Sequence, residues 1–194
     1  MKKVKIKDLP FRNLALVIFI AVLFFSLGSL WTEVRYLKKG TTASTNSPDL
    51  YTEIAPKGTP DYGNKAGVSY DQVEESLNAL VGYDKGITLA GAGEKRYIKI
   101  GTSKETACEF CCGIGEAGFG TAEGEIACGC GHNIAFSGLS KWLIQNSSYS
   151  DEQIIEEIKK WKILFFPKAA VAKELQKRGI SPDSTDLPSQ RGGC

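Results

Sequence analysis

The chain has 194 residues, of which 42% are hydrophobic and 24% are charged. This length is enough for one modest domain with additional segments. The formal net charge is only +2 at pH 7, so the chain lacks the overall basic field that nucleic-acid-binding domains use. No nucleic-acid partner is therefore expected, and the overall charge identifies no protein partner.

The N-terminal region combines a basic leader with a long apolar stretch. Residues 1–13 hold five basic side chains and one acid, and residues 14–31 hold no charged side chain. At about 1.5 Å of rise per residue, such a stretch covers about 27 Å as a helix, close to the thickness of a bilayer core. The sequence therefore predicts a transmembrane helix over 14–31.

The flanking charges predict how this segment is oriented. Basic residues are in excess before it, which favours a cytoplasmic leader and an extracytoplasmic remainder. A signal peptide cleaved after Gly28 is the main alternative, and a buried core helix would normally show a polar face. We predict an uncleaved signal-anchor in the cell membrane, with a single pass and the N-terminus inside.

The segment after the predicted anchor is polar and contains many small residues. Within residues 32–66, positions 40–66 are rich in Gly, Thr, Ser, Asn and Pro, and few of them could supply a core. This composition predicts a flexible spacer. An extracytoplasmic cysteine-rich domain is expected over 67–179, followed by a disordered polar tail over 180–194.

The first half of the expected domain shows two different patterns. Ser69 to Leu80 predicts a helix, because Val73, Leu77 and Leu80 fall on one face. Residues 86–101 predict β structure, with a hairpin connection at 91–95, because they are rich in β-forming side chains. The Gly-Ala-Gly and lysine in this connection lack the spacing of a phosphate-binding loop.

The second half predicts three helices. The first follows Ala135, the second opens at Ser150 with a capping box to Gln153, and the third begins at Pro167 and ends at Gly179. We expect them to pack around Leu139, Leu143, Ile154, Ile158, Trp161 and Val171.

Together these elements predict an α+β fold. It has an N-terminal transmembrane helix, a spacer, and a small, mostly helical domain with a short β-hairpin and a cysteine-rich loop.

Five of the six cysteines and the only histidine lie within 25 residues of one another. Thiolates and imidazole are ligands for zinc and copper. A C-x2-C pair with a second group further on is typical of tetrahedral zinc, but the second group here is C-x-C-x-H. Zinc is four-coordinate, so five thiolates are more than one zinc ion requires. The surplus is consistent with Cu(I) or with a second metal ion. The sequence predicts a site for a soft metal ion, zinc or copper, formed by Cys108, Cys111, Cys112, Cys128, Cys130 and His132.

Two alternatives remain open for this cluster. Exported cysteines oxidise where the compartment allows, so disulfides could staple an interaction module. Thiol–disulfide chemistry at Cys108-x-x-Cys111 is the other alternative, although no thioredoxin-like pattern surrounds that pair. No catalytic residue can be assigned, and binding fits the sequence better than enzymatic catalysis.

Two further site types are disfavoured. Residues 113–118 formally match G-x-G-x-x-G, but a dinucleotide site needs a strand before this loop and a helix after it. A Cys–His nucleophile pair is a poor fit to a glycine-rich group of five thiols.

Residues 126–162 resemble exported proteins of unknown function that are named for a PCYCGC motif. The likeness rests on Cys128-Gly-Cys130-Gly-His132, followed by two helices of which the second opens Ser150-Asp-Glu-Gln-Ile154. The family's first motif cysteine would fall on Ile126, and its further cysteines lie downstream rather than upstream. The resemblance implies an exported, membrane-tethered cysteine site for a metal.

Overall fold

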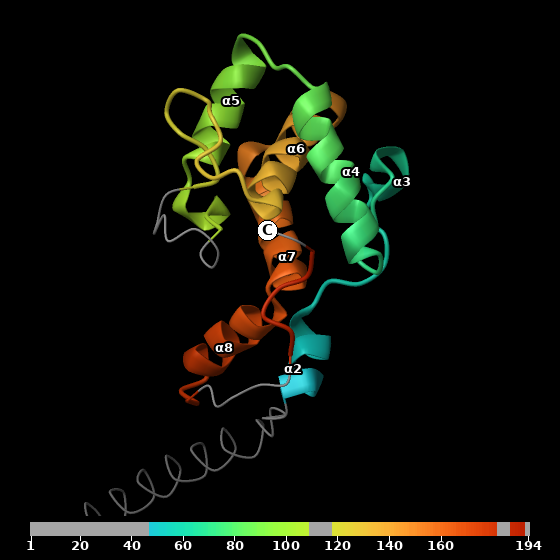
Figure 1. Cartoon of the computed structure of the whole chain (residues 1–194), viewed down its shortest axis with the longest axis vertical. Coiled ribbons are helices and arrows are strands. Elements are labelled where there is room, and N and C mark those ends of the chain that lie inside the picture. Colours follow the sequence, from blue (N-terminus) through green and yellow to red (C-terminus); the bar gives the residue numbers. More distant parts are fainter. Residues whose placement is uncertain (1–46, 109–117, 182–186, 193–194) are drawn as a thin grey trace, which may run out of the picture. The chain divides into compact units, whose positions relative to one another are not determined.

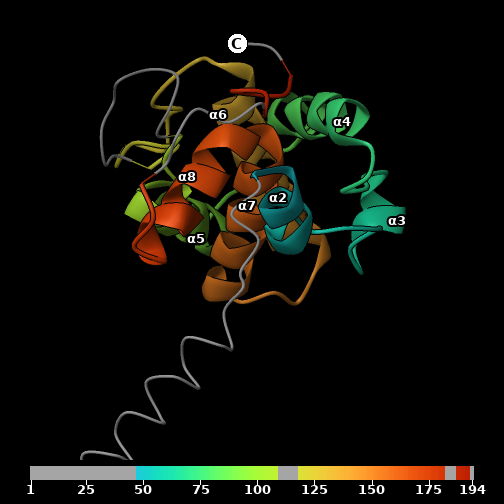
Figure 2. The same ribbon diagram turned by 90° about the horizontal axis from the view of Figure 1, so that it is seen from below.

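The computed structural model describes residues 47–108, 118–181 and 187–192, and Figures 1 and 2 show it from two directions. All of these residues belong to one compact unit. The predicted leader and transmembrane segment, together with Cys111, Cys112 and Cys194, lie outside the described residues. Among the helices that are described, none is both long and apolar enough to cross a membrane.

The described residues form seven α-helices and one 3₁₀ turn. In chain order these are α2 (Ser47–Ile54), α3 (Gly63–Ala66), α4 (Val73–Gly86), α5 (Ala92–Gly101), η2 (Lys104–Thr106), α6 (Gly131–Asn146), α7 (Asp151–Phe165) and α8 (Pro167–Lys177).

The predicted α+β class and its β-hairpin are wrong. The described part of the chain contains no strand, only an isolated antiparallel bridge between Gly120 and Ile126. Of residues 86–101, expected to form β structure, residues 92–101 form α5. Tyr97 and Ile100, three residues apart, are both buried on the face of α5 that packs towards α6. Burial at helical spacing outweighs the strand preference of these side chains, which depends strongly on context.

Helix α6 is the centre of the packing, between α4 and α5 and against α7 (Figure 1). The crossing with α4 is close because Gly138 has no side chain. A Cβ atom at this position would lie 1.8 Å from the backbone oxygen of Leu80. Leu139 and Leu143 of α6 are fully buried, as predicted. The first turn of α6 therefore belongs to a helix that packs closely against α4.

The local signals predicted for α7 and α8 are confirmed. The Ser150 hydroxyl accepts a hydrogen bond from the Gln153 backbone N–H, and the Gln153 side chain accepts one from the Ser150 N–H. Ile154, Ile158 and Trp161 of α7 are fully buried. Helix α8 begins at Pro167, and it packs beside α7 and α2 (Figure 2).

The core begins before residue 67. Leu50, Tyr62 and Ala66 fall in the range assigned to the spacer, yet all three are buried. Leu50 packs with Val171 and Leu175 of α8 in a small second cluster. These partners lie more than 100 residues later in the chain, so the composition around Leu50 gives no sign of them.

A buried carboxylate connects the early segment to α7. Glu157 is 5% exposed, and it accepts hydrogen bonds from the hydroxyls of Tyr62 at 3.1 Å and Tyr70 at 2.5 Å. Lys160 pairs with its other oxygen, and the Trp161 indole N–H donates to the Tyr62 hydroxyl. Burial, reinforced by the negative charge of Glu157, raises the pKa of both tyrosines well above the ordinary value. Both hydroxyls therefore stay protonated and act as donors to the carboxylate.

Candidate metal centre

Two segments bring the cysteine and histidine side chains together. Cys108 follows the η2 turn, and Cys130 is the residue that caps the N-terminus of α6. His132 lies in the first turn of the same helix. The Cys130 sulfur accepts a hydrogen bond from the Asn133 backbone N–H at 3.5 Å. The helix thus fixes the position of two of the three side chains.

The Sγ atoms of Cys108 and Cys130 and a ring nitrogen of His132 all lie within 4.8 Å of one another. We call these three residues the Cys2His group. Cys108 is 8% exposed, His132 is fully buried, and Cys130 is partly exposed. Thiolate and imidazole donors at this spacing can converge on one metal ion, so the arrangement is compatible with metal binding.

A backbone hydrogen bond and two aromatic rings fix the orientation of the His132 imidazole. Its Nε2 lies 2.7 Å from the backbone carbonyl oxygen of Arg191. A carbonyl oxygen only accepts, so Nε2 carries a proton and donates it, and this bond fixes the orientation of the ring. The ring also packs against Phe165 and Phe166, with centroid separations of 5.1 and 4.7 Å. This support resembles the outer hydrogen bond that orients most metal-binding histidines.

The surroundings of Cys130 favour its thiolate. The neighbouring Cys108 thiol is the main cause of a pKa that falls from the ordinary 9.0 to about 4. Partial burial opposes this shift, while His132 and the Asn133 N–H at the helix N-terminus add to it. Cys130 is therefore deprotonated at neutral pH, which is the form that binds metal ions.

The six residues predicted from the sequence have different positions in the structure. Cys108, Cys130 and His132 come together, and both of these cysteines are in the reduced thiol form. Cys128 is disulfide-bonded. Cys111 and Cys112 lie outside the described residues. Arg191 could not be predicted as part of the site, because it contributes through its backbone carbonyl, and the polar sequence around it carries no signal of a contact with His132.

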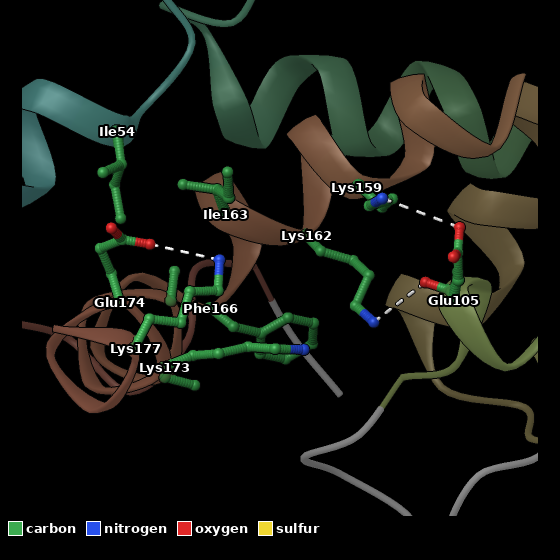
Figure 3. A pocket seen from close by; sticks show the side chains of 11 residues that line it. Ile54, Glu105, Lys159, Lys162, Ile163, Phe166, Lys173, Glu174 and Lys177 are labelled. Carbon is green, nitrogen blue, oxygen red and sulfur yellow. Dashed lines mark hydrogen bonds and ion pairs between the residues drawn. The ribbon is translucent and has the colours of Figure 1, made fainter. Parts of the chain in front are cut away.

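A groove of about 390 Å³ is lined by residues of η2, α7 and α8, together with Ile54 of α2 (Figure 3). Phe166 lines this groove and also packs against His132. Two of the lining lysines pair with acidic groups: Lys159 lies 3.7 Å from the Glu105 carboxylate, and Lys177 lies 3.2 Å from that of Glu174. The lining thus combines apolar side chains with ion pairs, and Phe166 connects the groove to the imidazole.

Comparison of this chain with protein-family models, with curated proteins and with solved structures found no match. The site is therefore interpreted from its own geometry.

Proposed function

We propose that the Cys2His group binds a soft metal ion, copper or zinc, and that the protein handles or transfers this ion. The convergence of two thiol sulfurs and a histidine nitrogen within 4.8 Å is the observation that carries this proposal. Exposed acidic clusters often occur without a metal, but this group is largely buried and contains no carboxylate. Its donors are those that soft and borderline ions prefer.

Copper(I) is the first candidate. Zinc in proteins is almost always tetrahedral, so a zinc ion here would need a fourth ligand, such as water, besides the three donors of the group. Soft thiolates select Cu(I) in preference to harder ions, and two thiolates together with one imidazole can complete its coordination. Zinc remains the second candidate, because Cys2His with one open position is also a known zinc arrangement.

The unequal exposure of the ligands supports transfer over a purely structural role. Structural zinc sites are closed, with all ligands supplied by the protein. Here Cys130 is partly exposed, whereas Cys108 and His132 are buried. An incoming thiol or metal carrier would therefore meet the ion on the side of Cys130.

The proposed location rests on the sequence. The apolar segment 14–31 behind a basic leader supports a single-pass anchor with the metal-binding part outside the cytoplasm. The resemblance to exported PCYCGC proteins supports the same location. An impermeant thiol reagent applied to intact cells should label Cys130. Labelling only after the membrane is opened would contradict the proposed orientation.

The metal proposal is tested with the purified full chain, kept under argon. Titration with Cu(I) against a chromogenic chelator, and separately with Zn²⁺, should show one equivalent of one ion bound per chain. Cys108→Ser, Cys130→Ser and His132→Ala should each weaken this binding at least tenfold. Gly129→Ala is the matched control, because a methyl group there meets no atom within 4 Å and removes no ligand. Binding that survives both cysteine changes would refute the proposal.

A further inference from the structure

The cysteines around the start of α6 are in two oxidation states. Cys128 is disulfide-bonded, whereas Cys130, two residues later, is a thiol. Cys108, the other reduced cysteine, has its sulfur within 4.8 Å of the Cys130 sulfur. A disulfide requires a sulfur–sulfur distance of about 2.05 Å, so closing this pair takes an approach of no more than about 3 Å. Rotation of the side chains and a small backbone shift can supply that.

The two thiols differ in their access to solvent. Cys130 is partly exposed, and the neighbouring Gly129 has open space around it. Cys108 is 8% exposed and belongs to the main hydrophobic core cluster. An external disulfide can therefore reach Cys130 first, while Cys108 is placed behind it, within reach of the same sulfur.

We propose that Cys108 and Cys130 form a redox-active dithiol that exchanges with an external disulfide, in which Cys130 attacks and Cys108 resolves. The Cys130 thiolate attacks one sulfur of the external disulfide, which forms a mixed disulfide and releases one thiolate. That thiolate takes the proton of Cys108. The Cys108 thiolate then attacks the Cys130 sulfur and releases the second thiolate. The two cysteines lose two electrons in total, and the external disulfide is reduced to two thiols.

This exchange would also regulate the proposed metal site, and that consequence rests on the proposed function. A disulfide between Cys108 and Cys130 leaves His132 as the only intact donor of the group, so oxidation should release the ion. Conversely, a bound ion occupies both sulfurs and should protect them from exchange. The metal-free chain is therefore the form that reacts with disulfides.

The test uses oxidised glutathione as the disulfide and the metal-free full chain under argon. The reaction is quenched with acid, remaining thiols are alkylated, and the disulfides are mapped by mass spectrometry. The wild-type chain should yield a Cys108–Cys130 linked peptide, with two equivalents of glutathione released for each such peptide. Cys108→Ser should yield no linked peptide and retain glutathione on Cys130, one equivalent less being released than by the wild type. Cys130→Ser should react at least tenfold more slowly at Cys108.

Because Cys108 is buried, Cys108→Ala is prepared alongside the serine variant, and the thermal unfolding of both is compared with that of the wild type. A wild-type chain that accumulates glutathione on Cys130 without forming the linked peptide would overturn the proposal, as would equal reactivity of the two cysteines. The same experiments distinguish a failure of the proposed metal site from a failure of the proposed dithiol. A reduced chain that binds no ion but still forms the Cys108–Cys130 disulfide refutes the metal site and supports the dithiol.

Discussion

The Nε2–H of His132 donates a hydrogen bond to the backbone carbonyl oxygen of Arg191, 59 residues later in the chain and 2.7 Å away. A second bond fixes this segment, because the Arg191 N–H donates to the carbonyl oxygen of Phe165 at 2.8 Å. The segment around Arg191 thus lies between the end of α7 and the imidazole. A tail without sequence features of its own becomes part of the candidate metal centre.

Removal of residues 191–194 should weaken metal binding about 10- to 100-fold, the usual cost of losing the hydrogen-bond partner of a metal-binding histidine. Arg191→Ala retains the backbone carbonyl and should leave affinity within about threefold of the wild type. Cys194→Ser controls for the loss of the terminal cysteine. Competitive chelator titration of the three variants measures the difference. Equal affinity of the truncated and full chains would show that the Arg191 carbonyl does not support the site.

Cys130 should remain reactive at acidic pH in the metal-free chain. Because its pKa is lowered to about 4, alkylation by iodoacetamide should stay near its maximal rate down to about pH 5 and fall below that. Rates are read at Cys130 by peptide mapping in the pH range where the chain stays folded. A rate that instead falls with a midpoint near the ordinary value of 9.0 would contradict the assigned thiolate.

The same shift gives a pH dependence of stability. The pKa of Cys130 is lower in the folded chain than in the unfolded one, so the folded state binds fewer protons between about pH 4 and 9. The ionised Cys130 therefore adds its full contribution to the free energy of unfolding above about pH 9. This contribution is lost progressively as the pH falls to about 4. Urea unfolding of the metal-free wild type and of Cys130→Ser across this range should show a difference that shrinks towards acid pH.

Gly138→Ala should strongly destabilise the fold. The added methyl group would lie 1.8 Å from the Leu80 carbonyl oxygen and would force α4 and α6 apart. Overpacking of this kind usually costs about 1–3 kcal/mol, and a clash with backbone places this variant at or above the upper end. Gly82→Ala on α4 is the matched control, since its methyl group meets nothing within 4 Å and should stabilise by about 0.5–1 kcal/mol. Urea denaturation of both variants measures the contrast.

Glu157→Ala should also destabilise the chain, by about 3 kcal/mol or more, because it leaves the buried hydroxyls of Tyr62 and Tyr70 without their acceptor. Glu156→Ala is the adjacent control. Its carboxylate is exposed and forms an i,i+3 pair with Lys159, which should contribute less than about 1 kcal/mol. Thermal unfolding compares the two. A smaller effect at Glu157 than at Glu156 would mean that the buried network does not join residues 62–70 to α7.

The sequence by itself determined the features that depend on neighbours in the chain. The capping box at Ser150 and the proline at position 167 locate the starts of α7 and α8, because capping and the fixed proline φ act within one helical turn. The apolar spacing of Leu139 with Leu143, and of Ile154 with Ile158, identified core positions for the same reason. The concentration of cysteines with the single histidine also indicated where the candidate site lies.

Only the tertiary structure decided the rest. Residues 92–101 became a helix because Tyr97 and Ile100 bury against α6, and Leu50 entered a core because α8 covers it. The sequence could not select Cys108, Cys130 and His132 from the six predicted ligands, or add the carbonyl of Arg191. Each of these outcomes depends on contacts between segments far apart in the chain. Such contacts follow from how the whole core packs, and local residue patterns do not encode them.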